Sequence, residues 1–274
     1  MQSAGAAFRY TIDTRKLPPE IAGKVVEFCC DSATAQFVEE CKKTPHSRLR
    51  LLLCHFLSLA LPDYEAHGLL RMFPMFLLDE HRWRALLGGE DSSCALRESL
   101  LDIGAGQGFV TRYARGLFRT IVTTETSPAM AKRLRARGFA CHAVDIAKYP
   151  EVLGGRKFSA VSLLNILDRC AYPLTLLARA VDCMEDDGLL IIADPLPFKP
   201  YMRGRACTVP QKEHMPVPES AVWEECLAHF IAHVLVPRGL EVVRLARLPY
   251  LYKGSNRIPC HYLDDFVVVC RRKK

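Results

Sequence analysis

The sequence lacks any apolar segment long enough to cross a bilayer. The longest apolar run near its front, residues 51–61, is eleven residues long and contains His55, whereas a membrane-spanning helix needs about 20 residues. The first twenty residues include Arg9, Asp13, Arg15 and Lys16 and no apolar leader core. The sequence therefore predicts a chain with no transmembrane segment and no signal peptide.

Cysteine and histidine patterns typical of metal sites are also missing. None of the 12 cysteines forms a C-x-x-C pair, and no H-E-x-x-H motif occurs. His229 and His233 are four residues apart on one predicted helix face, but no third ligand accompanies them. Scattered cysteines are typical of reduced, buried thiols. We therefore predict that the protein binds no metal. We also predict that it resides in an intracellular, reducing compartment, of which the cytoplasm is the leading candidate.

The positive charge is not arranged as a nucleic-acid-binding stripe. The net charge is +7, and basic residues gather at 132–137, within the helix predicted at 128–137, and in the tail 271–274 without interleaved aromatic residues. Internal repeats and low-complexity tracts are absent as well. The sequence predicts no nucleic-acid partner.

The most informative motif in the sequence is a glycine-rich turn between a predicted strand and a predicted helix. Residues 100–103 are mostly apolar, as in a buried strand, and glycines follow at alternate positions, Gly104, Gly106 and Gly108. Residues 109–117 then show helical spacing. A strand, a glycine turn and a helix are typical of a nucleotide-binding α/β unit.

The residues around this turn favour S-adenosylmethionine over a dinucleotide. The spacing is G-x-G-x-G, and Asp102 lies where a carboxylate would meet a ligand ammonium and repel a pyrophosphate. Glu125 follows the second predicted strand, at a position suited to ribose hydroxyls. Asp145 follows the third predicted strand and would either accept a hydrogen bond from the adenine amino group or cap the next turn.

Residues 1–98 and 99–274 differ in pattern. The first part predicts helices at 21–41, 49–61 (a more buried one) and 69–87 (interrupted at Pro74), followed by a linker at 88–93; we interpret 1–98 as a helical cap on the main domain. From residue 99, predicted strands alternate with helices. The strands are 99–103, 120–124, 140–144, 158–164, 189–194, 241–247 and 262–270; the helices are 109–117, 128–137, 174–184 and 220–236.

This alternation predicts an α/β fold with a largely parallel, seven-stranded sheet. Only a loop joins the last two strands, which favours an antiparallel hairpin. Seven strands with a terminal hairpin form the Rossmann-like architecture of class I methyltransferases. Residues 99–274 would then be the S-adenosylmethionine-dependent domain.

The fourth predicted strand leads into a candidate acceptor site. Asn165 and Asp168 are three residues apart, so they would share a face of a helical turn. Asp168 could instead pair with Arg169 or cap the next helix. The D-P-L-P-F segment at 194–198 follows the fifth strand and not the fourth, which argues against a base-methylating enzyme.

Several motifs together resemble the DREV-type class I methyltransferases, which modify protein histidine at the ring nitrogen nearer the backbone. They are L-D-I-G-A-G-Q-G-F-V-T at 101–111, T-E-T-S-P-A-M at 124–130, L-N-I-L-D-R-C-A-Y-P-L-T-L-L at 164–177, L-P-F-K-P-Y at 196–201, R-L-P-Y-L at 247–251 and Y-L-D-D at 262–265. Gln107 and Phe109 depart from the acids usual in that glycine turn.

The resemblance implies roles for individual residues. Asp102, the glycine turn, Glu125, Asn165 and Tyr250 match positions that hold the cofactor, and Asp168 matches the acid that contacts the target imidazole. Family substrates carry a His-x-His motif, so the implied partners are proteins or peptides with that motif. The implied product of the cofactor is S-adenosylhomocysteine.

Two other functions are compatible with the sequence. One is a small-molecule N-methyltransferase, in which the helical front covers a closed pocket. The other is an inactive methyltransferase-like binding module, which would need a damaged site. The residue types expected of an intact site are all present.

Overall fold

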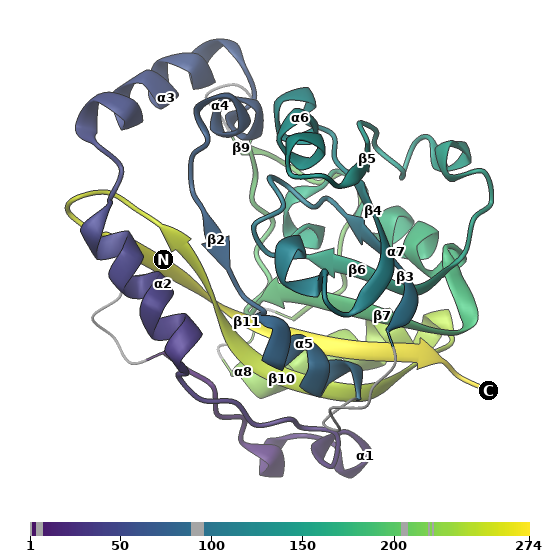
Figure 1. Ribbon diagram of the computed structural model, residues 1–274. Coiled ribbons are helices and arrows are strands. Elements are labelled where there is room, and N and C mark those ends of the chain that lie inside the picture. The colour runs from purple at the N-terminus through teal and green to yellow at the C-terminus, as the bar shows by residue number, and fades with distance from the viewer. Residues whose placement is uncertain (1, 4–7, 89–95, 204–207, 219, 221) are drawn as a thin grey trace.

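The computed structural model describes residues 2–3, 8–88, 96–203, 208–218, 220 and 222–274. Its main sheet follows the order β2-β10-β11-β7-β6-β3-β4-β5, and β1 pairs with β11 (Figure 1). A separate small sheet pairs β8 with β9. The strands are β1 (Gln2–Ser3), β2 (Met75–Phe76), β3 (Arg97–Ile103), β4 (Phe118–Thr124), β5 (Ala140–His142), β6 (Phe158–Leu164), β7 (Met184–Pro195), β8 (Met202–Arg203), β9 (Thr208–Val209), β10 (Leu240–Lys253) and β11 (Cys260–Arg272).

Helices and helical turns connect and cover these strands. The α-helices are α1 (Pro19–Ala22), α2 (Ser32–Lys43), α3 (Arg48–Ala60), α4 (Asp63–Leu70), α5 (Glu80–Leu87), α6 (Pro128–Ala136), α7 (Pro173–Asp182) and α8 (Trp223–Phe230). The shorter turns are η1 (Thr14–Lys16), η2 (Thr111–Ala114), η3 (Pro150–Leu153), η4 (Leu167–Arg169), η5 (Ile231–Leu235, a π turn) and η6 (Val236–Arg238).

The centre of the sheet is parallel and its β10–β11 side is antiparallel. β3 runs parallel to β4 and β6, and β7 continues this direction beside β6. β11 runs antiparallel to both β7 and β10. The predicted class I methyltransferase fold is therefore confirmed, and all seven predicted strands are present. β1 and β2, both from the front of the chain, add two short strands that the sequence did not indicate.

Both faces of the sheet are covered, as its apolar strands require. Side chains alternate across a strand, so Leu100 and Leu101 enter different cores. The Leu101 side packs against α7 and α8, and the Leu100 side against α5, including Trp83. The carboxyl ends of the parallel strands meet at one edge between these layers.

Several predicted helices differ from those observed, and the break predicted at Pro74 within 69–87 extends from Leu70 to Glu80 and contains β2. The stretch 109–117 forms only the short turn η2, which ends at Ala114, and β4 begins at Phe118. The helix predicted over 21–41 begins at Ser32, where the Asp31 carboxylate accepts a hydrogen bond from the Thr34 amide at 2.8 Å. Residues 49–61 correspond to helix α3, but this helix is mostly exposed on its outer face and not buried.

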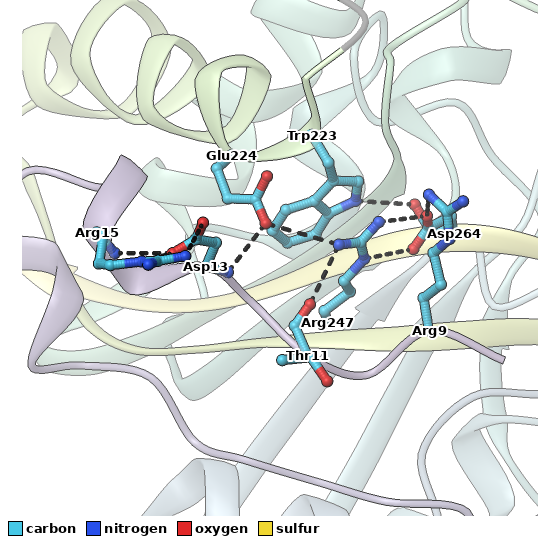
Figure 2. A network of polar contacts seen from close by, with 8 residues as sticks. All are labelled: Arg9, Thr11, Asp13, Arg15, Trp223, Glu224, Arg247 and Asp264. Atoms are coloured by element: carbon cyan, nitrogen blue, oxygen red, sulfur yellow. Dashed lines mark hydrogen bonds and ion pairs between the residues drawn. The ribbon is translucent and has the colours of Figure 1, made fainter.

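A buried ionic network attaches the front of the chain to the β10–β11 hairpin (Figure 2). The Arg247 guanidinium donates two hydrogen bonds to the Asp264 carboxylate, at 2.8 and 2.7 Å, and one to the Thr11 carbonyl at 3.1 Å. It lies 4.5 Å from the centre of the Trp223 ring. The Glu224 carboxylate lies 3.7 Å from Arg247 and accepts a hydrogen bond from the Asp13 amide. Arg247 and Asp264 belong to the R-L-P-Y-L and Y-L-D-D motifs, so these motifs have a structural role.

Across the described ranges, no helix is both long enough and apolar enough to span a bilayer.

Candidate active site

The glycine turn lies at the carboxyl edge of β3 and is held by β4. The Gly104 and Ala105 amides donate to the Thr124 carbonyl at 2.9 and 3.1 Å. Gly104 has a φ of +71°, and a Cβ there would lie 2.0 Å from Ile166 Cδ1. Gly106 has a φ of +57°, but a Cβ there would meet nothing within 4 Å. Gly104 is thus needed for packing, whereas Gly106 faces open space where a ligand can approach the backbone.

Glu125 connects this turn to the start of α6. Its carboxylate accepts hydrogen bonds from the Gly106 amide at 2.8 Å and the Ser127 amide at 2.9 Å. Burial raises the pKa of Glu125, and these two amides oppose that shift. Glu125 therefore lies beside the open face of Gly106, at the position predicted for a ribose-binding acid.

Asp102 is directed into the sheet edge. Its two carboxylate oxygens accept hydrogen bonds from the hydroxyls of Ser162, at 2.7 Å, and Thr111, at 2.6 Å. Burial raises the pKa of Asp102 to about 6, although both hydroxyls oppose the shift. The carboxylate thus fixes the junction of β3, β6 and η2, and any contact with a ligand ammonium would add to these bonds.

Asp145 caps the turn that follows β5. Its carboxylate accepts a hydrogen bond from the Ala147 amide at 3.1 Å and lies 3.5 Å from the Lys148 ammonium. The capping alternative is therefore present in the structure. Tyr64, on α4, lies close enough that burial and then the charges of Glu65, Glu125 and Asp145, partly offset by Lys148, raise its pKa.

Asn165 follows β6 at the part of the edge where the sequence predicts the acceptor site, which we call the acceptor end. Its φ is +57°, in the left-handed region, and its amide donates to the Ala193 carbonyl at 2.7 Å. The side-chain Nδ2 donates to Asp265 Oδ2 at 2.5 Å. Asn165 Oδ1 is buried and accepts no hydrogen bond from any described residue. A buried acceptor of this kind is usually satisfied by a ligand or water.

Asp168 is buried in turn η4, with 3% of its surface exposed. Its Oδ2 accepts a long hydrogen bond from Arg169 Nε at 3.4 Å, and Oδ1 lies 3.3 Å from the same nitrogen. Oδ1 accepts no hydrogen bond within the described part of the chain. The alternative pairing with Arg169 is therefore present, but it leaves one carboxylate oxygen available to a donor.

Two further buried acids surround Asp168. Asp194, at the end of β7, accepts a hydrogen bond from the Asp168 amide at 3.3 Å. Burial, and then the charge of Asp168, raises the pKa of Asp194 well above its ordinary value. Burial likewise raises the pKa of Asp265 on β11, despite its hydrogen bond from Asn165. Asp194 Oδ2 and Asp265 Oδ1 also lack a hydrogen bond from any residue that the structure describes.

Tyr250, on β10, lies on the same side as Asp168. The Arg169 guanidinium carbon is 5.9 Å from the centre of the Tyr250 ring, and the Tyr250 hydroxyl donates to Met75 Sδ at 2.6 Å. Burial raises the pKa of this hydroxyl. The front of the chain thus contacts the acceptor end through Met75.

The front also contacts the cofactor end. Glu65, on α4, accepts hydrogen bonds from the Ser127 hydroxyl and, at 3.1 Å, from the Ala129 amide at the start of α6. Gln107, in the glycine turn, donates to the Met72 carbonyl at 2.8 Å. The segment from α4 to β2 therefore connects the two ends of the site.

The structure places the predicted residues in two groups along one edge. Gly104, Gly106 and Glu125 border open space at the glycine turn, with Asp102 beneath them and Asp145 beyond. Asn165, Asp168 and Tyr250 gather across β6, η4 and β10. Sequence reasoning did not assign Asp265 or Tyr64 to the site, and it considered Asp194 only as part of the D-P-L-P-F segment. The Y-L-D-D motif could have indicated Asp265, since a carboxylate inside an apolar strand is rarely buried without a role.

His229 and His233, on α8 and the π turn that follows it, have ring centres 4.0 Å apart and ring planes inclined by 36°. No group of three or more metal-binding side chains suited to an ion occurs in the portion of the chain that the structure describes.

This edge of the sheet has an open glycine turn at one end. At the other end it has a buried group of carboxylates. The turn presents backbone and a carboxylate to one ligand, as nucleoside binding requires. The acceptor end presents oxygen atoms that need donors, and Arg169 is its nearby positive charge. This arrangement suits transfer between a nucleoside-containing donor and an acceptor that carries N–H groups.

Solved structures with similar folds include several methyltransferases. One is the N-methyltransferase NodS of Bradyrhizobium japonicum with S-adenosylhomocysteine, at 14% identity over 70% of this chain and 84% of that chain, TM-score 0.44. Another is the 1,6-didemethyltoxoflavin-N1-methyltransferase of Burkholderia thailandensis, at 18% identity over 71% and 76%, TM-score 0.47. A putative methyltransferase of Bacillus halodurans is 12% identical over 67% and 96%, TM-score 0.47. Similarity at this level says nothing about the substrate of this chain.

The sequence itself is more informative. The profile of the family described as DREV methyltransferase matches residues 9–272, nearly the whole chain and including every candidate site residue. The resemblance seen in the motifs is thereby confirmed, and the chain belongs to the DREV methyltransferase family.

Proposed function

We propose that this chain is an S-adenosylmethionine-dependent protein-histidine N-methyltransferase that modifies the pros nitrogen of histidine in His-x-His motifs. The observation that carries this proposal is the buried carboxylate of Asp168 at the acceptor end of the sheet edge, whose Oδ1 accepts no hydrogen bond from the N–H and hydroxyl groups of the described residues, although Arg169 Nε lies 3.3 Å away. The proposed substrate class follows from the family resemblance and from the chemistry of that carboxylate.

The donor would bind at the glycine turn. A Cβ at Gly106 would meet nothing within 4 Å, so the backbone there is open to a ligand. Glu125 is fixed by two amide hydrogen bonds and would accept bonds from ribose hydroxyls. Asn165 Oδ1 needs a donor, and a ligand ammonium or the target ring would provide one. S-adenosylmethionine, when bound, would supply an electrophilic methyl group on a sulfonium.

Asp168 would select the reactive form of the acceptor. A neutral imidazole has one N–H and one nitrogen with a free lone pair. A carboxylate that accepts the N–H of the distal nitrogen leaves the lone pair on the nitrogen nearer the backbone, and it makes the ring more basic. It also stabilises the positive charge that develops on the ring. The role of Asp168 would thus be to position the imidazole ring and to stabilise its charge.

A small-molecule N-methyltransferase is the second candidate. The contacts that favour it are those of the α4–β2 segment, because Glu65 and Met75 join the two ends of the site and would limit access of a large substrate. It would use the same donor site and the same carboxylates. The two functions differ only in the acceptor.

Methyl transfer to peptides separates them. The purified chain is incubated with labelled S-adenosylmethionine and a His-x-His peptide, or with the same peptide carrying alanine at both histidines. The proposal predicts label only on the histidine peptide. The same assay is applied to the variant Asp168→Asn. Its control is Asp182→Asn, because Asp182 lies at the exposed end of α7. No label on either peptide, together with label on small metabolites, would favour the second candidate.

A further inference from the structure

The outer face of α3 is apolar and exposed to solvent. Leu49 is 74% exposed and Phe56 is 58% exposed, and three more leucines are about half exposed. Their spacing of three or four residues places them on one side of the helix. The five residues, which we call the α3 stripe, are Leu49, Leu52, Leu53, Phe56 and Leu59.

The side chains of the α3 stripe do not pack in the protein core. The opposite side of α3 packs against α4 and buries Cys54 in a small cluster with Ala66 and Met72. A soluble helix normally directs its apolar residues inward, so a contiguous exposed stripe indicates a surface that binds something.

The surroundings of the stripe carry positive charge. Residues 41–62 include Lys42, Lys43, Arg48 and Arg50 and no acidic residue. Acidic residues lie just outside this range, Glu39 and Glu40 before it and Asp63 and Glu65 after it. A contiguous apolar helix face with basic residues beside it is typical of helices that lie in a membrane interface.

A group of arginines extends this basic surface past the end of α4. The Arg50 guanidinium donates to the carbonyls of Leu70 and Arg71, and Arg133 donates to the Leu69 carbonyl at 3.1 Å. In Figure 1, α3, α4 and α6 lie along the same side of the molecule.

Further arginines join this group beyond α6. The Arg115 guanidinium donates to the Arg137 carbonyl. Burial, and then the charges of Arg112, Arg71, Arg133 and Arg115, lower the pKa of Arg137. Among the described residues, none of these five arginines pairs with a carboxylate within ion-pair distance. They are Arg71, Arg112, Arg115, Arg133 and Arg137, the α6 arginine group.

We propose that the α3 stripe and the α6 arginine group form an interfacial binding surface for a bilayer that contains anionic lipids. The stripe would enter the boundary between headgroups and acyl chains, and the arginines would meet the phosphates and anionic headgroups. A helix of 13 residues lies along such a surface and does not cross it.

Two other partners fit less well. A second copy of the chain would bring two basic surfaces together, which like-charge repulsion opposes. A nucleic acid would use the arginines but leave five large apolar side chains in water, where they contribute nothing to phosphate binding.

Vesicle co-sedimentation of the full chain tests the proposal. We expect binding to phosphatidylcholine–phosphatidylserine vesicles, weaker binding to phosphatidylcholine alone, and weakening by salt. Leu53→Ser with Phe56→Ser should reduce binding at least ~10-fold, because two apolar side chains are lost from the interface. The matched control is Leu96→Ser with Val236→Ser, two similarly exposed residues outside α3, and it should bind as the wild type does.

Other results would overturn the proposal. Equal binding to both kinds of vesicle would show that anionic lipids are not recognised. Unchanged binding of the double variant, with an unchanged melting temperature, would show that the α3 stripe does not contact the bilayer. A dimer in solution that the same double variant dissolves, without vesicle binding, would assign the stripe to self-association. Binding to a single-stranded RNA without binding to vesicles would assign the arginines to nucleic acid.

Discussion

Replacing Arg247 by leucine should destabilise the fold strongly. The Arg247 side chain is only 8% exposed, forms two hydrogen bonds with Asp264 and one with the Thr11 carbonyl, and stacks on Trp223. Leucine removes all these contacts and leaves the largely buried Asp264 carboxylate with only Arg9, which lies 4.0 Å away and is 61% exposed. Breaking a buried pair in this way costs about 3–5 kcal/mol in the free energy of unfolding.

Urea unfolding monitored by circular dichroism measures this cost. The control is Arg271→Leu, because Arg271 pairs with Glu241 on the same hairpin but is 52% exposed. An exposed pair contributes about 0–1 kcal/mol. The double variant Arg247→Leu/Asp264→Leu should lose less than the sum of the single variants, because neither charge is left alone. A loss for Arg247→Leu no larger than for Arg271→Leu would refute the role of the network.

Three further predictions concern the site. Glu125→Ala should weaken S-adenosylhomocysteine binding, measured by calorimetry, by about 1.5–3 kcal/mol, the range for hydrogen bonds to a charged group; an unchanged affinity would remove Glu125 from the site. Asp168→Asn should lower turnover on a His-x-His peptide at least ~10²-fold while cofactor affinity stays near that of the wild type; near-normal turnover would leave Asp168 only a structural role. The pKa of Asp102 is raised to about 6, so its ionisation opposes folding and the free energy of unfolding should fall as the pH rises from about 4 to about 6. Asp102→Asn should show a smaller fall in urea titrations across that range, because Glu125, Asp194 and Asp265, whose pKa values burial also raises, still contribute to it; an identical pH dependence in both proteins would contradict the reasoning.

The sequence predicted the buried part of the fold well. Strand β6 was predicted at its observed bounds, because a short apolar run enclosed on both faces has few alternatives. Hydrophobic pattern does not report where a helix must end, so the stretch after Gly108 was predicted as a helix although only residues 111–114 form a helical turn, η2. The N-cap at Asp31 was also missed within a continuous apolar pattern.

Exposure and long-range contacts were harder to predict. The leucines of α3 have the pattern of a buried helix, and only the position of α3 at the periphery leaves them in solvent. The strand-end rule identified Glu125 and Asp168, because parallel strands end at one edge. It could not identify Asp265, which reaches Asn165 through an antiparallel strand 100 residues later in the chain.

The position of the methyl group on the imidazole ring tests the central proposal most directly. After reaction with S-adenosylmethionine and a His-x-His peptide, acid hydrolysis and chromatography against the two methylhistidine standards identify the modified nitrogen. If Asp168 holds the N–H of the distal nitrogen, the product is methylated only on the nitrogen nearer the backbone. Methylation on the distal nitrogen, or on neither, would contradict the account.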